Sequence, residues 1–180
     1  LNEAKIDLMA RHGCHVAHCP SSNLKLASGL APVAAMLERG LNVGLGTDGA
    51  ASNNRLDAWE EMRLAALLAK GVSGRPEVLP AHQALHMATL GSARALGLDA
   101  RIGSLQAGKQ ADVVAVSLED ATMQPCYDIV SQMVYSAGRA QVDHVWVGGR
   151  QVVRSGACTT LDESAVIQQA HRWHDRLRPA

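Results

Sequence analysis

Two short polar stretches follow apolar segments in the first third of the chain, and both carry side chains that could take part in catalysis. One is HCPSSNLKL at residues 18–26, and the other is GLGTDGAASNN at residues 44–54. The second stretch has one acid, Asp48, among glycines and small polar residues. Barrel enzymes place catalytic groups in loops at the carboxyl ends of buried parallel strands. Asp48 is therefore a candidate catalytic residue, with a helix cap or an ordinary loop residue as the alternative.

The first stretch offers His18 and Asn23 as candidate substrate-binding residues, because both side chains can form hydrogen bonds with a polar ligand. Their alternatives are structural: His18 would tie the strand end to its neighbours, and Asn23 would close a turn. Cys19 is a poor candidate nucleophile, because neighbouring residues of a strand point to opposite faces and His18 is thereby turned away. The histidines show no HxH or HExxH spacing, so we expect no complete metal site within these 180 residues.

The first half of the chain alternates between helical and strand-like patterns. Apolar residues at helical spacing predict helices, and short apolar runs predict two buried strands, the second of which ends on Asp48. Asp57, followed by Glu60 three residues on, resembles a capping box and predicts a helix start. This order implies parallel strands joined by crossover helices. The predicted helices are 2–13, 31–40 and 58–70, the strands are 14–19 and 41–48, and a polar loop covers 20–29.

From about residue 101 the patterns change to those of antiparallel β-structure. Segments 142–147 and 150–156 flank Gly148 and Gly149, which is typical of a hairpin with a two-residue turn. We therefore expect two domains, residues 1–100 and 101–180, joined at a short hinge in LDARIG. Further strand-like segments are 111–118 and 128–136, and a final helix is predicted over 161–177.

Composition and charge exclude several classes of partner. The 17 basic residues balance 17 acidic ones, so no net field attracts nucleic acid or an anionic membrane. No apolar stretch approaches the length of about 18 residues that a membrane helix requires. The four cysteines form no CxxC or zinc-finger pattern, which indicates a reducing compartment and predicts a cytoplasmic protein. We expect a small-molecule partner, with no nucleic acid and no membrane.

Three longer segments together resemble a known family. VAHCPSSNLKLASGLAPV at 16–33, LNVGLGTDGAASNNRLDAWEEMRLAALLAK at 41–70 and ATLGSARALGLDARIGSLQAGKQADVVAVSL at 88–118 are similar to the amidohydrolase superfamily. Within it, they resemble the 5-methylthioadenosine/S-adenosylhomocysteine deaminases and the related triazine and chlorohydrolase group. The resemblance implies an α/β fold that is the C-terminal part of a metal-dependent (β/α)8 barrel, followed by part of a small β-sandwich and a C-terminal helix.

The resemblance also implies roles for the candidate residues. Asp48 would end the eighth barrel strand, bind the metal and handle the proton of the attacking water. One divalent ion is implied, with zinc as the first choice and iron or manganese as alternatives. HCPSSN would follow the seventh strand, which makes His18 and Asn23 pocket residues and not metal ligands. Members of the family commonly form homo-oligomers, so the resemblance implies one here.

The implied reaction is hydrolytic deamination of an adenine-type nucleoside, 5-methylthioadenosine or S-adenosylhomocysteine, in which water attacks the ring carbon and ammonia leaves. Guanine or a halogenated s-triazine is the alternative substrate. The family's HxH pair, further histidines and glutamate are not found in this sequence. We therefore expect a C-terminal piece of a longer enzyme, inactive by itself. The alternative from another class is a non-catalytic fragment that binds a partner through exposed strand edges.

Overall fold

The computed structural model describes residues 1–178, which divide into two units. The first unit comprises residues 1–109 and 118–139, and the second comprises residues 110–117 and the chain from residue 140 onward. The expected division into residues 1–100 and 101–180 concerns the domains of the whole protein, and it stays a prediction.

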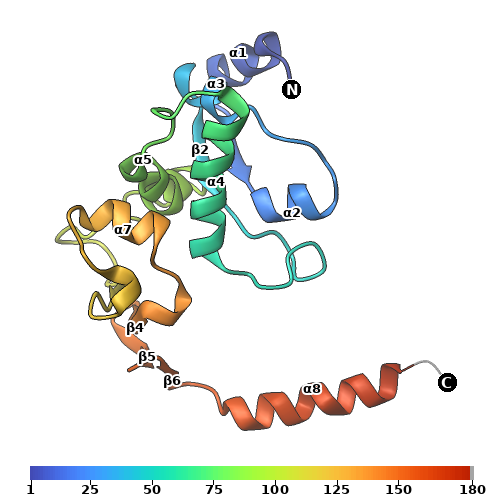
Figure 1. The fold of residues 1–180 in the computed structure, drawn as a ribbon, viewed down its shortest axis with the longest axis vertical. Helices are drawn as coiled ribbons and strands as arrows, with labels where there is room; N and C mark the ends of the chain where they lie inside the picture. The colour runs from blue at the N-terminus through green and yellow to red at the C-terminus, as the bar shows by residue number, and fades with distance from the viewer. Residues whose placement is uncertain (179–180) are drawn as a thin grey trace. The chain divides into compact units, whose positions relative to one another are not determined.

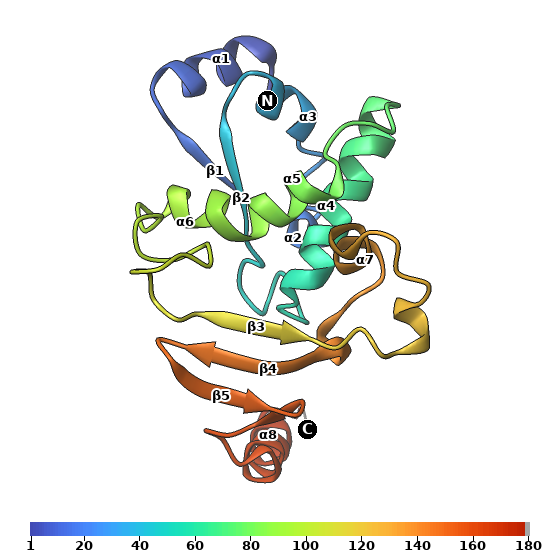
Figure 2. The same ribbon diagram turned by 90° about the vertical axis from the view of Figure 1, so that its left-hand side faces the viewer.

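Two parallel strands form the centre of the first unit. Strand β1 (His15–His18) pairs with β2 (Asn42–Leu45), and His18 lies opposite Leu45. Figure 2 shows the two strands side by side. Helix α3 (Val33–Glu38) lies between them in the sequence, so the connection is a helical crossover. The parallel pairing predicted from the order of elements is confirmed.

Helices precede and follow β1. Helix α1 (Glu3–Arg11) buries Ile6 in the core, and the prediction of a helix that ends at Gly13 is confirmed within two residues. Helix α2 (Pro20–Lys25) occupies the start of the region predicted to be a polar loop, so that prediction was wrong. The physical reason is Pro20, whose fixed φ is suited to the first turn of a helix.

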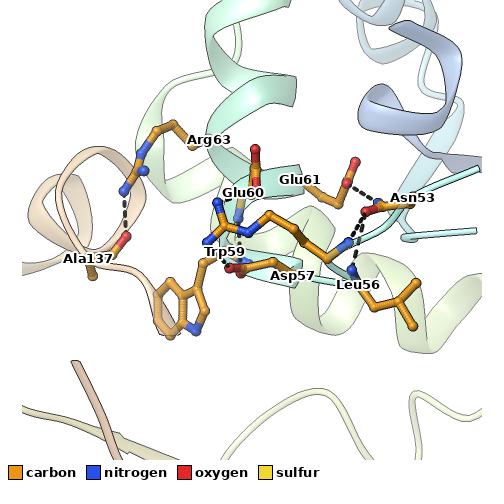
Figure 3. Close-up of polar contacts among 9 residues, drawn as sticks. Asn53, Leu56, Asp57, Trp59, Glu60, Glu61, Arg63 and Ala137 are labelled. Carbon is orange, nitrogen blue, oxygen red and sulfur yellow. Dashed lines mark hydrogen bonds and ion pairs between the residues drawn. The ribbon is translucent and has the colours of Figure 1, made fainter. Parts of the chain in front are cut away.

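Helix α4 (Ala58–Ser73) begins where the sequence predicts it. The Asp57 side chain accepts hydrogen bonds from the backbone N–H groups of Trp59 and Glu60, as Figure 3 shows. Glu60 does not complete the capping box, because its carboxylate lies 3.3 Å from the guanidinium of Arg55 instead. Asp57 therefore caps the helix without help from the Glu60 side chain.

Residues 128–136 form helix α7 (Ile129–Tyr135), so the strand-like interpretation of this segment was wrong. Asp128 accepts the backbone N–H of Ser131 and starts the helix. The apolar residues satisfy helical spacing as well as alternation, and Val134 and Ala137 are completely buried. The remaining helical segments of this unit are α5 (Ala81–His86), the π-helix η1 (Met87–Gly91), α6 (Ser92–Ala95) and the short η2 (Ala121–Met123).

The core of the first unit lies between β2 and the helices packed around it. Helix α4, which passes beside β2 and α5 in Figure 1, contributes the largest share. It is also tied to the residues after α7 by a hydrogen bond from Arg63 Nη2 to the Ala137 carbonyl (Figure 3). The buried apolar residues are Ile6, Val33, Met36, Leu41, Val43, Met62, Ala65, Ala66, Ala69, Val78, Leu79, Ala84, Met87 and Val134.

The second unit is an antiparallel sheet followed by a helix. Its strands lie in the order β3 (Val113–Val116), β4 (Val142–Val147), β5 (Arg150–Arg154) and β6 (Ala157–Cys158), and helix α8 (Glu163–Leu177) follows in the sequence. The turn between β4 and β5 has Gly148 and Gly149 at φ values of 56° and 81°. The predicted hairpin is confirmed. Every described residue of the helix α8 is exposed in this structure. The short η3 (Arg139–Gln141) precedes β4 in the sequence and begins on the last residue of the first unit.

Within residues 1–178, no helix combines the length and the apolar character that crossing a bilayer requires.

Candidate functional site

Asp48 lies in the loop that follows β2, three residues beyond the last strand residue, Leu45. The prediction that Asp48 ends the strand was therefore wrong in this detail. Its backbone has a φ of 60°, in the left-handed region, and its side chain is exposed. Aspartate is one of the few residues that tolerates this conformation, because its short side chain can form local hydrogen bonds. The backbone thus turns at the carboxyl end of β2 and exposes the carboxylate.

Two serines hold the Asp48 carboxylate. Ser22 Oγ, from α2, donates to Asp48 Oδ2 at 2.8 Å, and Ser52 Oγ, from the same loop as Asp48, donates to the same oxygen at 2.6 Å. These bonds, with Ser52 the larger contributor, and the backbone N–H of Gly49 lower the pKa of Asp48. The carboxylate is therefore ionised, exposed and fixed in orientation, as a metal ligand or a proton acceptor needs to be.

Cys19 packs against the chain just before Asp48. A Cβ on Gly46 would lie 3.2 Å from the Cys19 sulfur. Burial, followed by the negative charges of Asp48 and Glu61, raises the pKa of the Cys19 thiol. A raised pKa disfavours the nucleophilic thiolate, so these contacts support a packing role.

Glu61, on the first turn of α4, is a site residue that the sequence analysis missed. Its side chain is only 1% exposed, although it is an acid. Glu61 Oε2 accepts the backbone N–H of Ser21 at 3.0 Å, and Oε1 accepts Asn53 Nδ2 at 2.6 Å. Figure 3 shows the second of these contacts. One signal was present: Glu61 stands one helical turn before the apolar Ala65, on a buried face.

Lys25 provides a further link between the loops that follow the two strands. Its ammonium Nζ donates to the Ala51 carbonyl at 2.7 Å and to Asn54 Oδ1 at 2.6 Å. Ser22 also bonds directly to Asp48, and Glu61 accepts from both Ser21 and Asn53, so the segments 20–25 and 48–54 are held together at several points. The two polar stretches singled out in the sequence therefore form one connected structure.

His18 and Asn23 lie together, but not with Asp48. Both line a small crevice that is bounded by α2, α3 and α4 and includes Leu68 and Val72. His18 is buried, and burial lowers its pKa more than the negative charge of Glu61 raises it. Within residues 1–178, the Asn23 side-chain amide makes no hydrogen bond. The structure thus separates the three predicted site residues. Asp48 is exposed in its loop, while His18 and Asn23 line the crevice.

The described residues offer one part of a metal site. Within residues 1–178, no three histidine, cysteine, aspartate or glutamate side chains come together in a way that could hold a metal ion. Asp48 nevertheless suits the role of a single ligand, because zinc accepts carboxylate oxygens and this carboxylate is ionised and exposed. Glu61 does not suit it, because both of its oxygens already accept hydrogen bonds in a buried position.

The chain matches the amidohydrolase family over residues 1–152. It belongs to this family, as the resemblance of its three sequence segments predicts. The acid loop after β2 and the serine-bearing helix after β1 both fall within the matched range.

Particular relatives lie in the predicted branch. A 5-methylthioadenosine/S-adenosylhomocysteine deaminase from Desulforudis audaxviator is 54% identical over 98% of this chain, which spans 41% of that relative. An adenosine deaminase from Xanthomonas campestris, solved with bound zinc, is 47% identical with a TM-score of 0.95, over 98% of this chain and 40% of that one. Atrazine chlorohydrolase from Arthrobacter aurescens, complexed with zinc, is 28% identical with a TM-score of 0.86, over 96% of this chain and 38% of that one. The predicted branch of deaminases and triazine hydrolases is confirmed, and the chain covers less than half of each relative.

Proposed function

We propose that these residues form the C-terminal part of a metal-dependent (β/α)8 barrel, with residues 1–100 in the barrel and 101–180 in part of a small β-sandwich and a terminal helix. The parallel pair β1–β2 with its crossover helix supports the barrel portion. The four-stranded antiparallel sheet supports the second portion. The chain spans 41% of the length of the Desulforudis deaminase, which supports a partial domain.

The proposed reaction of the whole protein is the hydrolytic deamination of an adenine-type nucleoside, with 5-methylthioadenosine or S-adenosylhomocysteine as substrate. The observation that carries the proposal is the exposed, ionised Asp48 carboxylate at the carboxyl end of β2, held by Ser22 and Ser52. This arrangement occurs in a chain that is 54% identical to a deaminase named for these substrates. In the proposal the enzyme is a cytoplasmic homo-oligomer that binds neither nucleic acid nor a membrane.

Asp48 is the proposed metal ligand and the proposed proton acceptor. The metal would be one divalent ion, zinc first, with the other ligands supplied by residues outside these 180. Such an ion would supply a Lewis acid that lowers the pKa of water from 15.7 to about 7. The hydrogen bonds of Ser22 and Ser52 keep the Asp48 carboxylate oriented and ionised. In that form it would be able to accept a proton from the attacking water. The zinc bound in the Xanthomonas deaminase supports this choice of metal.

His18 and Asn23 are the proposed substrate-side residues. The Asn23 amide supports a ligand contact, because it borders the crevice and no hydrogen bond within the described residues occupies it. His18, the last residue of β1, lines the same crevice. Burial lowers its pKa and favours the neutral imidazole, which could form a hydrogen bond with a ligand in the crevice. The structural alternative for His18, in which it ties the strand end to its neighbours, is equally supported by this burial.

Ammonia release by the full-length protein tests the proposed reaction. We expect release from 5-methylthioadenosine and S-adenosylhomocysteine, and slower or no release from guanine and an amino-s-triazine. Atrazine is the chlorinated control, since the chlorohydrolase is a more distant relative at 28% identity. Faster turnover of guanine or atrazine would replace the proposed substrate. If metal-loaded protein turned over none of these compounds, the non-catalytic alternative would be favoured.

A further inference from the structure

We propose that Glu61 is a positioning residue for Asp48, which fixes the two segments whose serines hold the Asp48 carboxylate. This inference rests on the proposed function of Asp48. The hydrogen bonds of Glu61 go to Ser21 and Asn53 and not to Asp48. It acts through the residues next to the two serines.

The two carboxylates join the same two segments at adjacent positions. Asp48 accepts from the hydroxyls of Ser22 and Ser52. Glu61 accepts from the residues immediately before and after these serines, through the backbone N–H of Ser21 and the side-chain amide of Asn53. A shift of either segment that broke a bond to Glu61 would also move a donor of Asp48. The orientation of the exposed acid is thereby coupled to a buried one.

Burial makes Glu61 the more rigid member of this arrangement. It is 1% exposed, and Asn53 is 5% exposed, so neither can replace a lost partner with bulk water. A buried carboxylate is stable only when it is hydrogen-bonded, and hydrogen bonds to an ionised group are about twice as strong as neutral ones. The Asp48 carboxylate, by contrast, is exposed and depends on its neighbours for a fixed orientation.

The contacts of Glu61 are not those of a helix-starting residue. Asp57 caps α4 by accepting the backbone N–H groups of Trp59 and Glu60. Glu61 instead accepts from donors outside the helix, one 40 positions away and the other 8. Its role is therefore to hold the two segments and not to start the helix.

Glutamine in place of Glu61 cannot make both contacts. Its oxygen would accept from one partner, while its –NH₂ group would face the other donor, either the Ser21 N–H or the Asn53 amide. Reversal of the Asn53 amide offers no remedy, because Asn53 Oδ1 already accepts the backbone N–H groups of Arg55 and Leu56. Glu61→Gln thus removes one link while it keeps the size of the side chain.

The experiment compares Glu61→Gln with Glu60→Gln in the full-length, metal-loaded protein. Glu60 is the matched control, because it is the preceding acid on α4 and its partner is the exposed Arg55. The readouts are kcat, KM, melting temperature and the rate at which a chelator removes the metal. For Glu61→Gln we expect kcat to fall and chelation to quicken, each by about 10- to 100-fold, as for other residues that orient a ligand. We expect KM to stay within about twofold, because Glu61 contacts no substrate.

Rescue and a second variant separate positioning from folding. Glu61→Asp keeps the charge and should recover part of kcat and of metal retention. Asn53→Ser removes the donor to Glu61 while its hydroxyl can still close the turn, so it should show the same split in kcat and KM even if Glu61→Gln fails to fold. A lowered melting temperature with unchanged kcat and chelation rate in the folded protein would overturn the inference.

An Asp48→Asn arm distinguishes this inference from the function on which it rests. If Asp48→Asn keeps full activity and metal, the proposed function fails and the role of Glu61 fails with it. If Asp48→Asn is inactive while Glu61→Gln and Asn53→Ser both match Glu60→Gln, only the positioning role is overturned.

Discussion

Ser22 donates its hydroxyl hydrogen to Asp48 across 26 positions of the sequence, and the two residues come from the segments that follow two neighbouring parallel strands. Parallel strands place their carboxyl ends at the same edge of a sheet, so residues far apart in sequence meet there. The exposed Asp48 carboxylate is thereby oriented by a side chain that is itself buried. The proposed chemistry depends on this contact and on the matching bond from Ser52.

Loss of the Ser52 hydroxyl should raise the pKa of Asp48. The hydrogen bond from Ser52 is the largest cause of the lowered pKa, so Ser52→Ala in the metal-free protein should move it back toward its ordinary value. Because folding lowers the pKa of Asp48, its ionised carboxylate stabilises the folded state at pH values above the pKa of the unfolded chain. This stabilisation is lost as the pH falls through the pKa of the folded protein. Carboxyl carbon chemical shifts followed by NMR measure the change.

Thr47→Ala is the matched control for this titration. Thr47 Oγ1 donates to the backbone carbonyl of Asp48 and not to its carboxylate. We expect its removal to leave the pKa of Asp48 in place. Equal titration curves for Ser52→Ala and the unaltered protein would show that the hydroxyl does not set the ionisation of Asp48.

His18 should make stability depend on pH. Burial lowers its pKa below the ordinary 6.5, so the unfolded chain binds a proton at a pH where the folded chain does not. The free energy of unfolding should therefore decrease as the pH falls below about 6.5. His18→Gln should flatten this part of the profile in urea titrations between pH 7.5 and pH 5. His12→Gln, at an exposed histidine, should retain the slope, and a slope unaffected by either change would contradict the account.

Asp57→Ala should destabilise the start of α4. The change removes the acceptor for the backbone N–H groups of Trp59 and Glu60, and loss of such a cap costs about 0.5 to 2 kcal/mol. Asp57→Asn keeps the oxygen and should retain most of the stability. Urea unfolding curves measure both variants, and indistinguishable curves for them would argue against the cap.

Asn23→Ala and His18→Ala test the proposed pocket in the full-length protein. Loss of a substrate hydrogen bond should lower kcat/KM by about 5- to 150-fold, which corresponds to about 1 to 3 kcal/mol, with metal content unchanged. In the structural alternative the melting temperature falls and kcat/KM of the folded fraction stays as it was. The two residues need not agree, because Asn23 has an unpartnered amide while His18 is buried.

The sequence predicts the local elements well where one pattern dominates. The hairpin at Gly148 and the cap at Asp57 each have a local cause, and both are confirmed. The parallel pairing of the strands is confirmed too, because the order of elements predicts it. Residues 128–136 satisfy two periods at once, and packing of Val134 and Ala137 in the core decides for the helix. The loop prediction for 20–29 failed because it gave the serines and asparagine more weight than Pro20.

The candidate site was only partly accessible from the sequence. Asp48 stands out because its loop has a single acid and several glycines. Its serine partners and Glu61 could not be assigned, because the contacts join segments that are brought together only by the pairing of β1 with β2. A charged residue on a buried helix face signals that it has partners, but it does not name them.

Metal content and ammonia release of Asp48→Asn in the full-length protein test the central claim most directly. Asparagine keeps the size of the side chain and removes its charge, so folding should persist while the ligand and the proton acceptor are lost. We expect the variant to bind less metal than the unaltered protein and to lose deamination of 5-methylthioadenosine by at least about 100-fold. Normal metal content with normal ammonia release would contradict the assignment of Asp48 as ligand and proton acceptor.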